Sequence, residues 1–149
     1  MITLAFASDH AGFELKSFLI NEAKKLNFAI KDFGTRSIDS VDYPDYVHPL
    51  ANEVSLDNEM LGILICGSGN GVCMTANKHK GVRAALCWEP ALAELARQHN
   101  NANILCLPAR FISQESALNI MTSFLNSQFE GGRHEKRVGK IEEKQNGGF

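Results

Sequence analysis

The stretch Ile63-Leu64-Ile65-Cys66-Gly67-Ser68-Gly69-Asn70-Gly71 is an apolar run that passes directly into a glycine-punctuated loop. A short apolar run bounded by glycine is typical of a buried strand. We therefore predict a strand over Leu61–Cys66 that brings the Cys66 thiol to the edge of a sheet. The loop Gly67–Gly71 can turn its backbone N–H groups toward an anion. A thiol beside such a cradle indicates an enzyme that acts on a negatively charged intermediate.

Outward from this strand, short apolar runs alternate with longer stretches of helical period. Further strands are predicted over Ile2–Ala7, Phe28–Phe33, Val82–Cys87 and Asn103–Leu107. Helices are predicted around Leu15–Leu26, over Pro44–Asp57, Gly71–His79 and Pro90–Asn100, and after a capping Ser113. In the first helix the apolar residues share one face, and we place Lys16 elsewhere, among the polar residues. Strands separated by helices form a parallel sheet covered on both faces. The sequence therefore predicts an α/β domain with a five-stranded parallel sheet over residues 1–149.

Composition sets limits on the function. The 149 residues form a chain long enough to bury about 70% of its unfolded surface. A net charge of −2 gives no electrostatic reason to expect nucleic acid or an anionic membrane as a partner. No apolar run approaches the ~20 residues of a membrane span, and the N-terminus lacks the basic residues of a signal peptide. The four cysteines show no CxxC spacing, which argues against a disulfide framework or a structural zinc site and favours the cytoplasm.

Cys66 is the first candidate for chemistry. A cysteine within a strand is most often a small hydrophobic residue, and Cys73, Cys87 and Cys106 fit that interpretation. Cys66 differs because it precedes a helix-opening loop, where oriented amides lower a thiol pKa. We interpret Cys66 as functional.

The loop after Cys66 does not match two familiar phosphate-binding motifs. Its pattern is GxGxG, not GxGxxG, and it follows the third predicted strand, which speaks against a dinucleotide site. No Lys-Ser/Thr pair follows, so it is not a Walker A loop. Val72 occupies the position where a phosphatase loop of cysteine, five residues and arginine needs its arginine. A nest of N–H donors suited to an oxyanion or enediolate remains.

Other polar residues follow predicted strands and helices. Asp9 and His10 are either a turn with a helix cap or part of a ligand site. His99, near the end of a helix, either complements the helix C-terminus or transfers protons. Because ligands bind beyond the carboxyl ends of parallel strands, we expect Asp9, His10, Cys66–Gly71 and Arg110 at one edge.

Arg133 and Arg137 lie four residues apart in the basic segment Arg133-His134-Glu135-Lys136-Arg137. In a helix they share one face. That face is either a solvated basic surface or a clamp for phosphate oxygens, which Arg110 could join.

Six motifs, in register from the first strand to about Arg137, resemble one family. They are Ser8-Asp9-His10-Ala11-Gly12, Asp42-Tyr43-Pro44, Ile65–Gly71, Ala76-Asn77-Lys78, Arg97-Gln98-His99-Asn100 and Glu130-Gly131-Gly132-Arg133-His134. The chain thus resembles ribose-5-phosphate isomerase type B, a family that includes galactose-6-phosphate isomerase subunits. The resemblance implies a Rossmann-like three-layer sandwich and a cytoplasmic aldose–ketose isomerase of the pentose phosphate pathway, without metal or cofactor. It also implies a homodimer or dimer of dimers with shared active sites, toward which the C-terminal helix and tail over 130–149 reach.

The resemblance assigns a role to each candidate residue. Cys66 would be the base, His99 would assist ring opening with Asp9, and the Ser68 hydroxyl would help to hold the enediolate. The residues that would bind the substrate are Asp9, His10, Tyr43, Gly67, Ser68, Gly69, Asn70, Gly71, Asn100, Arg110, Arg133 and Arg137. His99, Asn100, Arg133 and Arg137 would come from the partner chain.

One departure and three alternatives bear on this interpretation. Ser68 stands where many relatives have threonine, which keeps the hydroxyl. Some relatives lack the cysteine and use a glutamate in the next helix, but here Thr75 lies in that region and no acid does, which favours Cys66. A hexose 6-phosphate (allose or galactose) is the alternative substrate. A non-catalytic sugar-phosphate-binding domain would not need Cys66 or His99. A thiol redox protein is disfavoured because no resolving cysteine lies close to Cys66 in the sequence.

Overall fold

The computed structural model describes residues 1–143, and the last part of the predicted C-terminal tail, 144–149, lies outside them. Its centre is a five-stranded parallel sheet in the order β2-β1-β3-β5-β4. The strands are β1 (Thr3–Ser8), β2 (Ala29–Asp32), β3 (Met60–Cys66), β4 (Ala84–Leu86) and β5 (Ile104–Pro108). The predicted α/β fold with a five-stranded parallel sheet is confirmed.

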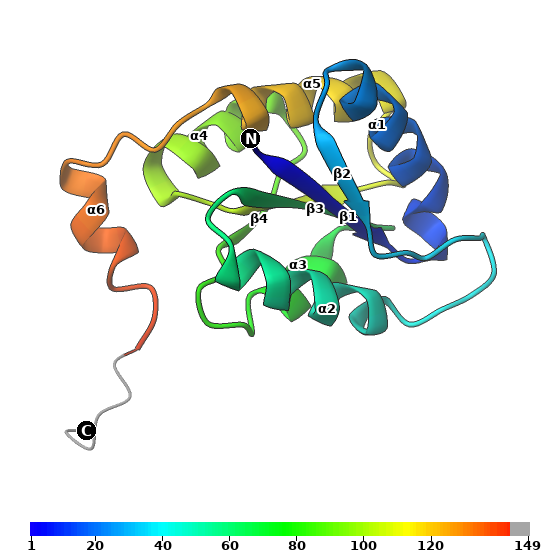
Figure 1. Ribbon diagram of the computed structural model, residues 1–149, viewed down its shortest axis with the longest axis horizontal. Coiled ribbons are helices and arrows are strands. Elements are labelled where there is room, and N and C mark those ends of the chain that lie inside the picture. The colour runs from blue at the N-terminus through cyan, green and yellow to red at the C-terminus, as the bar shows by residue number, and fades with distance from the viewer. Residues whose placement is uncertain (144–149) are drawn as a thin grey trace.

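Helices cover both faces of the sheet (Figure 1). On one face lie α1 (Phe13–Lys25), α4 (Pro90–Asn100) and α5 (Gln114–Asn126), and on the other lie α2 (Tyr43–Leu56) and α3 (Asn70–Ala76). A short 3₁₀ turn, η1 (His10–Gly12), precedes α1, and α6 (Arg133–Val138) follows α5. Ser113 caps α5 as predicted, since its Oγ accepts a hydrogen bond from the Ser116 amide at 3.0 Å.

The predicted strand Val82–Cys87 is too long. Only β4 forms, at the sheet edge, where it pairs with β5 alone. Just before it, the Arg83 amide donates to the Asn103 side chain at 2.8 Å, whereas the Arg83 carbonyl still accepts from the Asn103 amide at 2.9 Å. Val82 and Cys87 are nevertheless buried, which explains the apolar run.

β3 is the central element because all seven of its residues are buried. Such a strand reads as one continuous apolar run because both faces of a parallel sheet are covered. Ile63 and Ile65 belong to the core beneath α1, α4 and α5, whereas Leu64 and Cys66 belong to the core beneath α2 and α3. The alternation of side chains along the strand therefore turns Cys66 toward α2 and α3.

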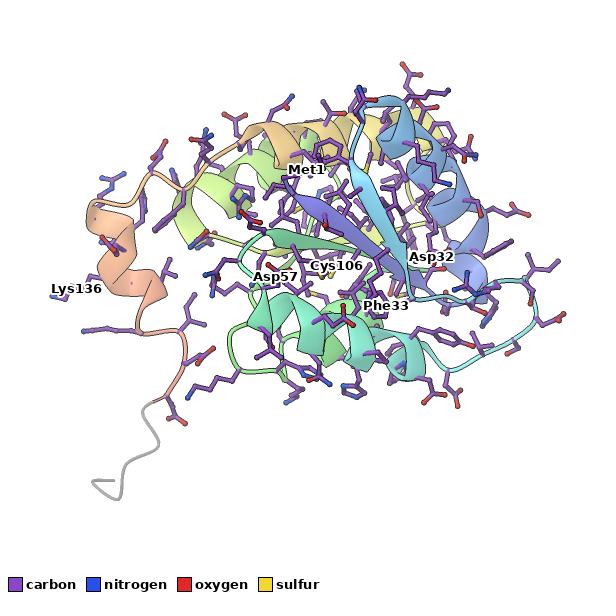
Figure 2. All side chains as sticks on the ribbon, in the orientation of Figure 1. Met1, Asp32, Phe33, Asp57, Cys106 and Lys136 are labelled. Atoms are coloured by element: carbon purple, nitrogen blue, oxygen red, sulfur yellow. The ribbon has the colours of Figure 1, made fainter. Side chains whose placement is uncertain are left out.

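α6 stands apart from the three layers. It has no buried residue, and its packing neighbour is α4. In Figure 2, Lys136 on α6 and Asp32, at the carboxyl end of β2, lie on opposite sides of the molecule. Within residues 1–143, no helix is long and apolar enough to cross a membrane.

Candidate active site

Cys66 and Asp9 meet where β1 and β3 end. Cys66 is 5% exposed, and the Asp9 amide donates to the Ile65 carbonyl at 3.3 Å. Gly12 allows this approach, because a Cβ there would lie 2.6 Å from the Ile65 oxygen. Asp9 is itself buried, and its Oδ1 accepts from the Gly12 amide at 3.1 Å. Asp9 can therefore both cap a helix and bind a ligand, since Oδ1 caps η1 and Oδ2 is left to contact the ligand.

The glycine loop turns sharply into α3. Gly69 has a φ of 75°, and a Cβ on it would lie 2.5 Å from the Leu86 side chain. The first helical hydrogen bond runs from the Cys73 amide to the Gly69 carbonyl at 3.2 Å, so the Gly71 amide has no partner within the helix. Ser68 Oγ accepts from the Asn70 amide at 3.3 Å, which leaves the hydroxyl proton to be donated elsewhere.

Tyr43 and Arg110 flank this loop. A Cβ on Gly71 would collide with the Tyr43 ring, lying 2.8 Å from its hydroxyl oxygen. A Cβ on Gly67 would lie 3.1 Å from Nη1 of Arg110, whose amide donates to the Gly67 carbonyl at 3.0 Å. The glycines therefore let a phenol and a guanidinium lie against the backbone beside Cys66.

His10 lines a pocket with Asp9 and residues 40–45. Its Nδ1 accepts a hydrogen bond from the Val41 amide at 3.2 Å. A neutral His10 ring therefore carries its proton on Nε2, where it can donate to an anionic ligand.

Lys16 is a residue that the sequence prediction misplaced, because it is buried and not on the polar face of its helix. The side chain is 1% exposed, and its Nζ donates to Asp32 Oδ1 at 2.6 Å and to the Thr35 carbonyl at 2.8 Å. Burial lowers the pKa of Lys16, and Asp32 opposes that effect. This ion pair fixes the start of the loop from β2 to α2, which lines the His10 pocket. Helical period cannot reveal it, since the partners come from other elements.

His99, Asn100, Arg133 and Arg137 form a second group. They line a groove between α4 and α6. The His99 and His134 rings stack, with centroids 4.1 Å apart and planes 13° apart. Arg133 and Arg137 both lie in α6, which puts the two guanidinium groups one turn apart.

The two groups lie at opposite edges of the sheet. Asp9, His10, Cys66–Gly71 and Arg110 gather at the carboxyl edge, as expected, and Tyr43 lies beside them against Gly71. α4 leaves that edge after β4 and returns the chain to the start of β5, so its last residues, His99 and Asn100, lie at the amino edge. There the Asn103 carbonyl accepts from Gly62, near the start of β3, at 2.9 Å. One chain therefore does not bring the second group to Cys66.

The other cysteines differ from one another. Cys87 and Cys106 are buried, as predicted, and burial raises both thiol pKa values, that of Cys87 to about 12. The prediction that Cys73 is equally buried is wrong, because it is partly exposed. A hydrogen bond with Cys106 is the main reason that the pKa of Cys73 is lowered.

Comparisons with known proteins point to one family. A family model described as Ribose/Galactose Isomerase matches residues 4–141. A probable ribose-5-phosphate isomerase B of Mycoplasma pneumoniae is 52% identical over 91% of this chain and 90% of its own length. The ribose-5-phosphate isomerase B of Escherichia coli is 41% identical over 95% of each chain.

Solved structures show the same fold. Ribose-5-phosphate isomerase B from Mycoplasma genitalium, with bound ribulose-5-phosphate, superposes with a TM-score of 0.91 at 46% identity, covering 94% of this chain and 93% of that one. The Thermotoga maritima enzyme has a TM-score of 0.91 at 48% identity, covering 94% and 97%.

Proposed function

The chain belongs to the ribose/galactose isomerase family, and on that premise we propose that it is an aldose–ketose isomerase that interconverts ribose 5-phosphate and ribulose 5-phosphate. The observation that carries this proposal is the Cys66 thiol at the end of β3, next to a loop whose amides open α3. Isomerisation needs a base for a carbon-bound proton and donors for the oxygen that becomes negative. Both lie within one short segment of this chain.

Cys66 acts as the base. As thiolate it takes the proton from C2 of the open-chain aldose, and the C2–H electron pair forms the C1–C2 double bond of a cis-enediolate. The thiol then returns the proton to C1, while the hydroxyl proton of O2 is transferred to O1, which leaves the ketose. Cys66 is regenerated, so no external reductant or oxidant takes part.

The loop stabilises the enediolate. The Gly71 amide and the Ser68 hydroxyl are donors without a competing partner inside α3. A donor aimed at a developing oxyanion contributes roughly 3–4 kcal/mol to the transition state. Tyr43, packed against Gly71, closes one side of the sugar pocket.

The remaining polar groups bind the phosphate and open the sugar ring. His10 donates from Nε2, and Arg110, Arg133 and Arg137 offer guanidinium forks to phosphate oxygens. His99, with Asp9, transfers the protons of ring opening, and Asn100 contacts the sugar.

These roles require two chains. Because His99, Asn100, Arg133 and Arg137 lie at the amino edge, we propose that a second copy supplies them to Cys66, in a homodimer or dimer of dimers. The segment from residue 130 onward would then be the part of this single domain that reaches the partner. All four cysteines are free, which fits a reducing cytoplasm.

The test is the initial rate of ketose formation from ribose 5-phosphate with EDTA present, for wild type and Cys66→Ala. General-base catalysis contributes about 10²–10⁴-fold, so we expect a loss of that size in turnover with sugar-phosphate binding retained. Wild type that binds ribose 5-phosphate without converting it is a binding domain. Faster conversion of allose or galactose 6-phosphate would make the substrate a hexose phosphate.

A further inference from the structure

Three potential metal ligands meet at the junction of α4 and α6. Nε2 of His99 and Nε2 of His134 each lie 3.7 Å from Oε1 of Glu130. All three ligand atoms lie within 4.8 Å of one another. A separation of 3.7 Å is too long for a hydrogen bond, so the carboxylate does not bond directly to either ring. The three groups leave a gap of atomic size between them.

The gap has the dimensions of a cation site. A tetrahedral ion with bonds of 2.0–2.2 Å holds its ligand atoms about 3.3–3.5 Å apart, so each His–Glu130 distance of 3.7 Å needs to close by only a few tenths of an ångström. The two rings are stacked with planes 13° apart, so one ring must tilt for both Nε2 lone pairs to point at the same ion. The backbone already holds the pieces together, because the Glu130 amide donates to the Gln98 carbonyl, beside His99, at 3.0 Å.

We propose that His99, Glu130 and His134 form a three-ligand site for a transition-metal cation of the Zn²⁺ class, with the fourth position open. Two imidazoles and one carboxylate suit Zn²⁺ or Co²⁺, whereas Mg²⁺ and Ca²⁺ prefer sets made of oxygen alone. Arg133 and Arg137 line the same groove, and the positive charge of their guanidinium groups weakens the binding of any cation there. The site is therefore one for reversible binding and not for a resident metal.

The consequence for turnover rests on the proposed function of His99. A cation on Nε2 occupies the lone pair that ring opening needs, so Zn²⁺ inhibits the isomerase and EDTA restores it. The cation would thus inhibit the enzyme and take no part in the proton transfers of the proposed reaction.

Co²⁺ titration of the reduced full-length chain tests the site without using activity. Wild type is expected to give the strong visible d–d absorption of four-coordinate Co²⁺, which Zn²⁺ displaces. Glu130→Gln and His134→Gln should each weaken binding at least about tenfold. Glu130 is half-exposed, so its variant folds irrespective of the result.

His48→Gln is the matched control. His48 and His79 form a second histidine pair, with Nδ1 and Nε2 2.7 Å apart, on α2 and the turn after α3. The proposal requires Co²⁺ binding to persist in His48→Gln. The proposal is overturned if His48→Gln loses Co²⁺ binding or if all variants bind Co²⁺ equally. It is also overturned if Glu130→Gln and His134→Gln keep a thiolate-to-Co²⁺ charge-transfer band, because the ligand would then be a cysteine.

Inhibition is the second measurement. Zn²⁺ should inhibit wild type at concentrations at least about tenfold below those that inhibit Glu130→Gln. Co²⁺ binding without any isomerase activity would refute the proposed function and leave the metal site standing. Isomerase activity without Co²⁺ binding would do the reverse.

Discussion

The two edges of the sheet carry candidate residues in contrasting ways. At the carboxyl edge, Cys66 and Asp9 are buried and tied to β1, β3 and β5 by backbone hydrogen bonds. At the amino edge, His99 is partly exposed, and α6 has no buried residue at all. The first region is rigid because it is the end of the core, whereas the second is a surface that a partner can complete.

The difference indicates how such a site divides its tasks. A base and an oxyanion cradle must hold their geometry within a fraction of an ångström, which core strands provide. On the proposed function, a partner chain adds His99, Arg133 and Arg137 to the phosphate-binding and ring-opening groups already present at the carboxyl edge. The predictions that follow test this division.

The largest expected effect is rescue between two inactive variants. Cys66→Ala and His99→Asn should each lose about 10²–10⁴-fold in turnover. If sites are shared, a heterodimer has one site with both changes and one intact site, so an equal mixture after subunit exchange recovers about a quarter of wild-type activity. Initial rates before and after exchange measure this.

The outcome is unambiguous because a site within one chain cannot be rescued this way. A mixture that stays as inactive as its two components would show that each chain completes its own site. The control is the same exchange with Cys66→Ala alone, which should recover nothing.

Gly71→Ala is expected to have the next largest effect. The added methyl would collide with the Tyr43 ring, which is 36% exposed and can swing outward. Folding should survive, whereas kcat/KM for ribose 5-phosphate should fall about 10–100-fold because the pocket wall is displaced.

A double-mutant cycle with Tyr43→Ala isolates the cause. If the added methyl acts through Tyr43, Gly71→Ala should lower kcat/KM little further in a chain that already carries Tyr43→Ala. Additive losses would mean instead that Gly71→Ala harms the amide donors directly.

Much of the carboxyl edge could be predicted from the sequence because it is local. The run Leu61–Cys66 and the glycines after it determine the strand, the turn and the thiol position within one short segment. The topology of parallel strands then brings Asp9 and Arg110 to the same edge. The family resemblance, and not the periodicity, suggested that His99 and Arg137 come from another chain.

What the sequence could not show depends on contacts between distant elements. The apolar period of α1 made Lys16 look like a surface lysine, yet Asp32 and Thr35 hold it inside. Glu130 lies 31 residues from His99 (130 minus 99), and only the return of the chain past α4 brings the two together. No local pattern encodes such pairs.

Lys16→Met tests the rigidity of the carboxyl edge. The substitution leaves the Thr35 carbonyl without the Lys16 ammonium and removes one of the partners of Asp32, which keeps the Gly34 amide, so unfolding should become easier by about 2 kcal/mol. Urea unfolding at neutral pH measures this, and an unchanged midpoint would show that the ion pair contributes nothing.

The same variant has a pH signature. The pKa of Lys16 is lowered in the folded protein, so between that pKa and its unfolded value the unfolded chain binds more protons. The unfolding free energy of wild type should therefore increase relative to that of Lys16→Met as the pH rises through this alkaline window. A difference that shrinks there would mean that the pKa shift has the opposite sign.

The smallest change in stability is expected at the amino edge, from Arg137→Ala. Arg137 is exposed and α6 has no fully buried residue, so the unfolding free energy should change by less than about 0.5 kcal/mol. The KM for ribose 5-phosphate should nevertheless rise at least about tenfold, because a charge-assisted hydrogen bond to phosphate is lost. Lys136→Ala, on the same exposed helix, is the control and should change neither quantity. A KM unchanged in Arg137→Ala would mean that Arg137 binds no phosphate and that the basic face of α6 is a solvated surface.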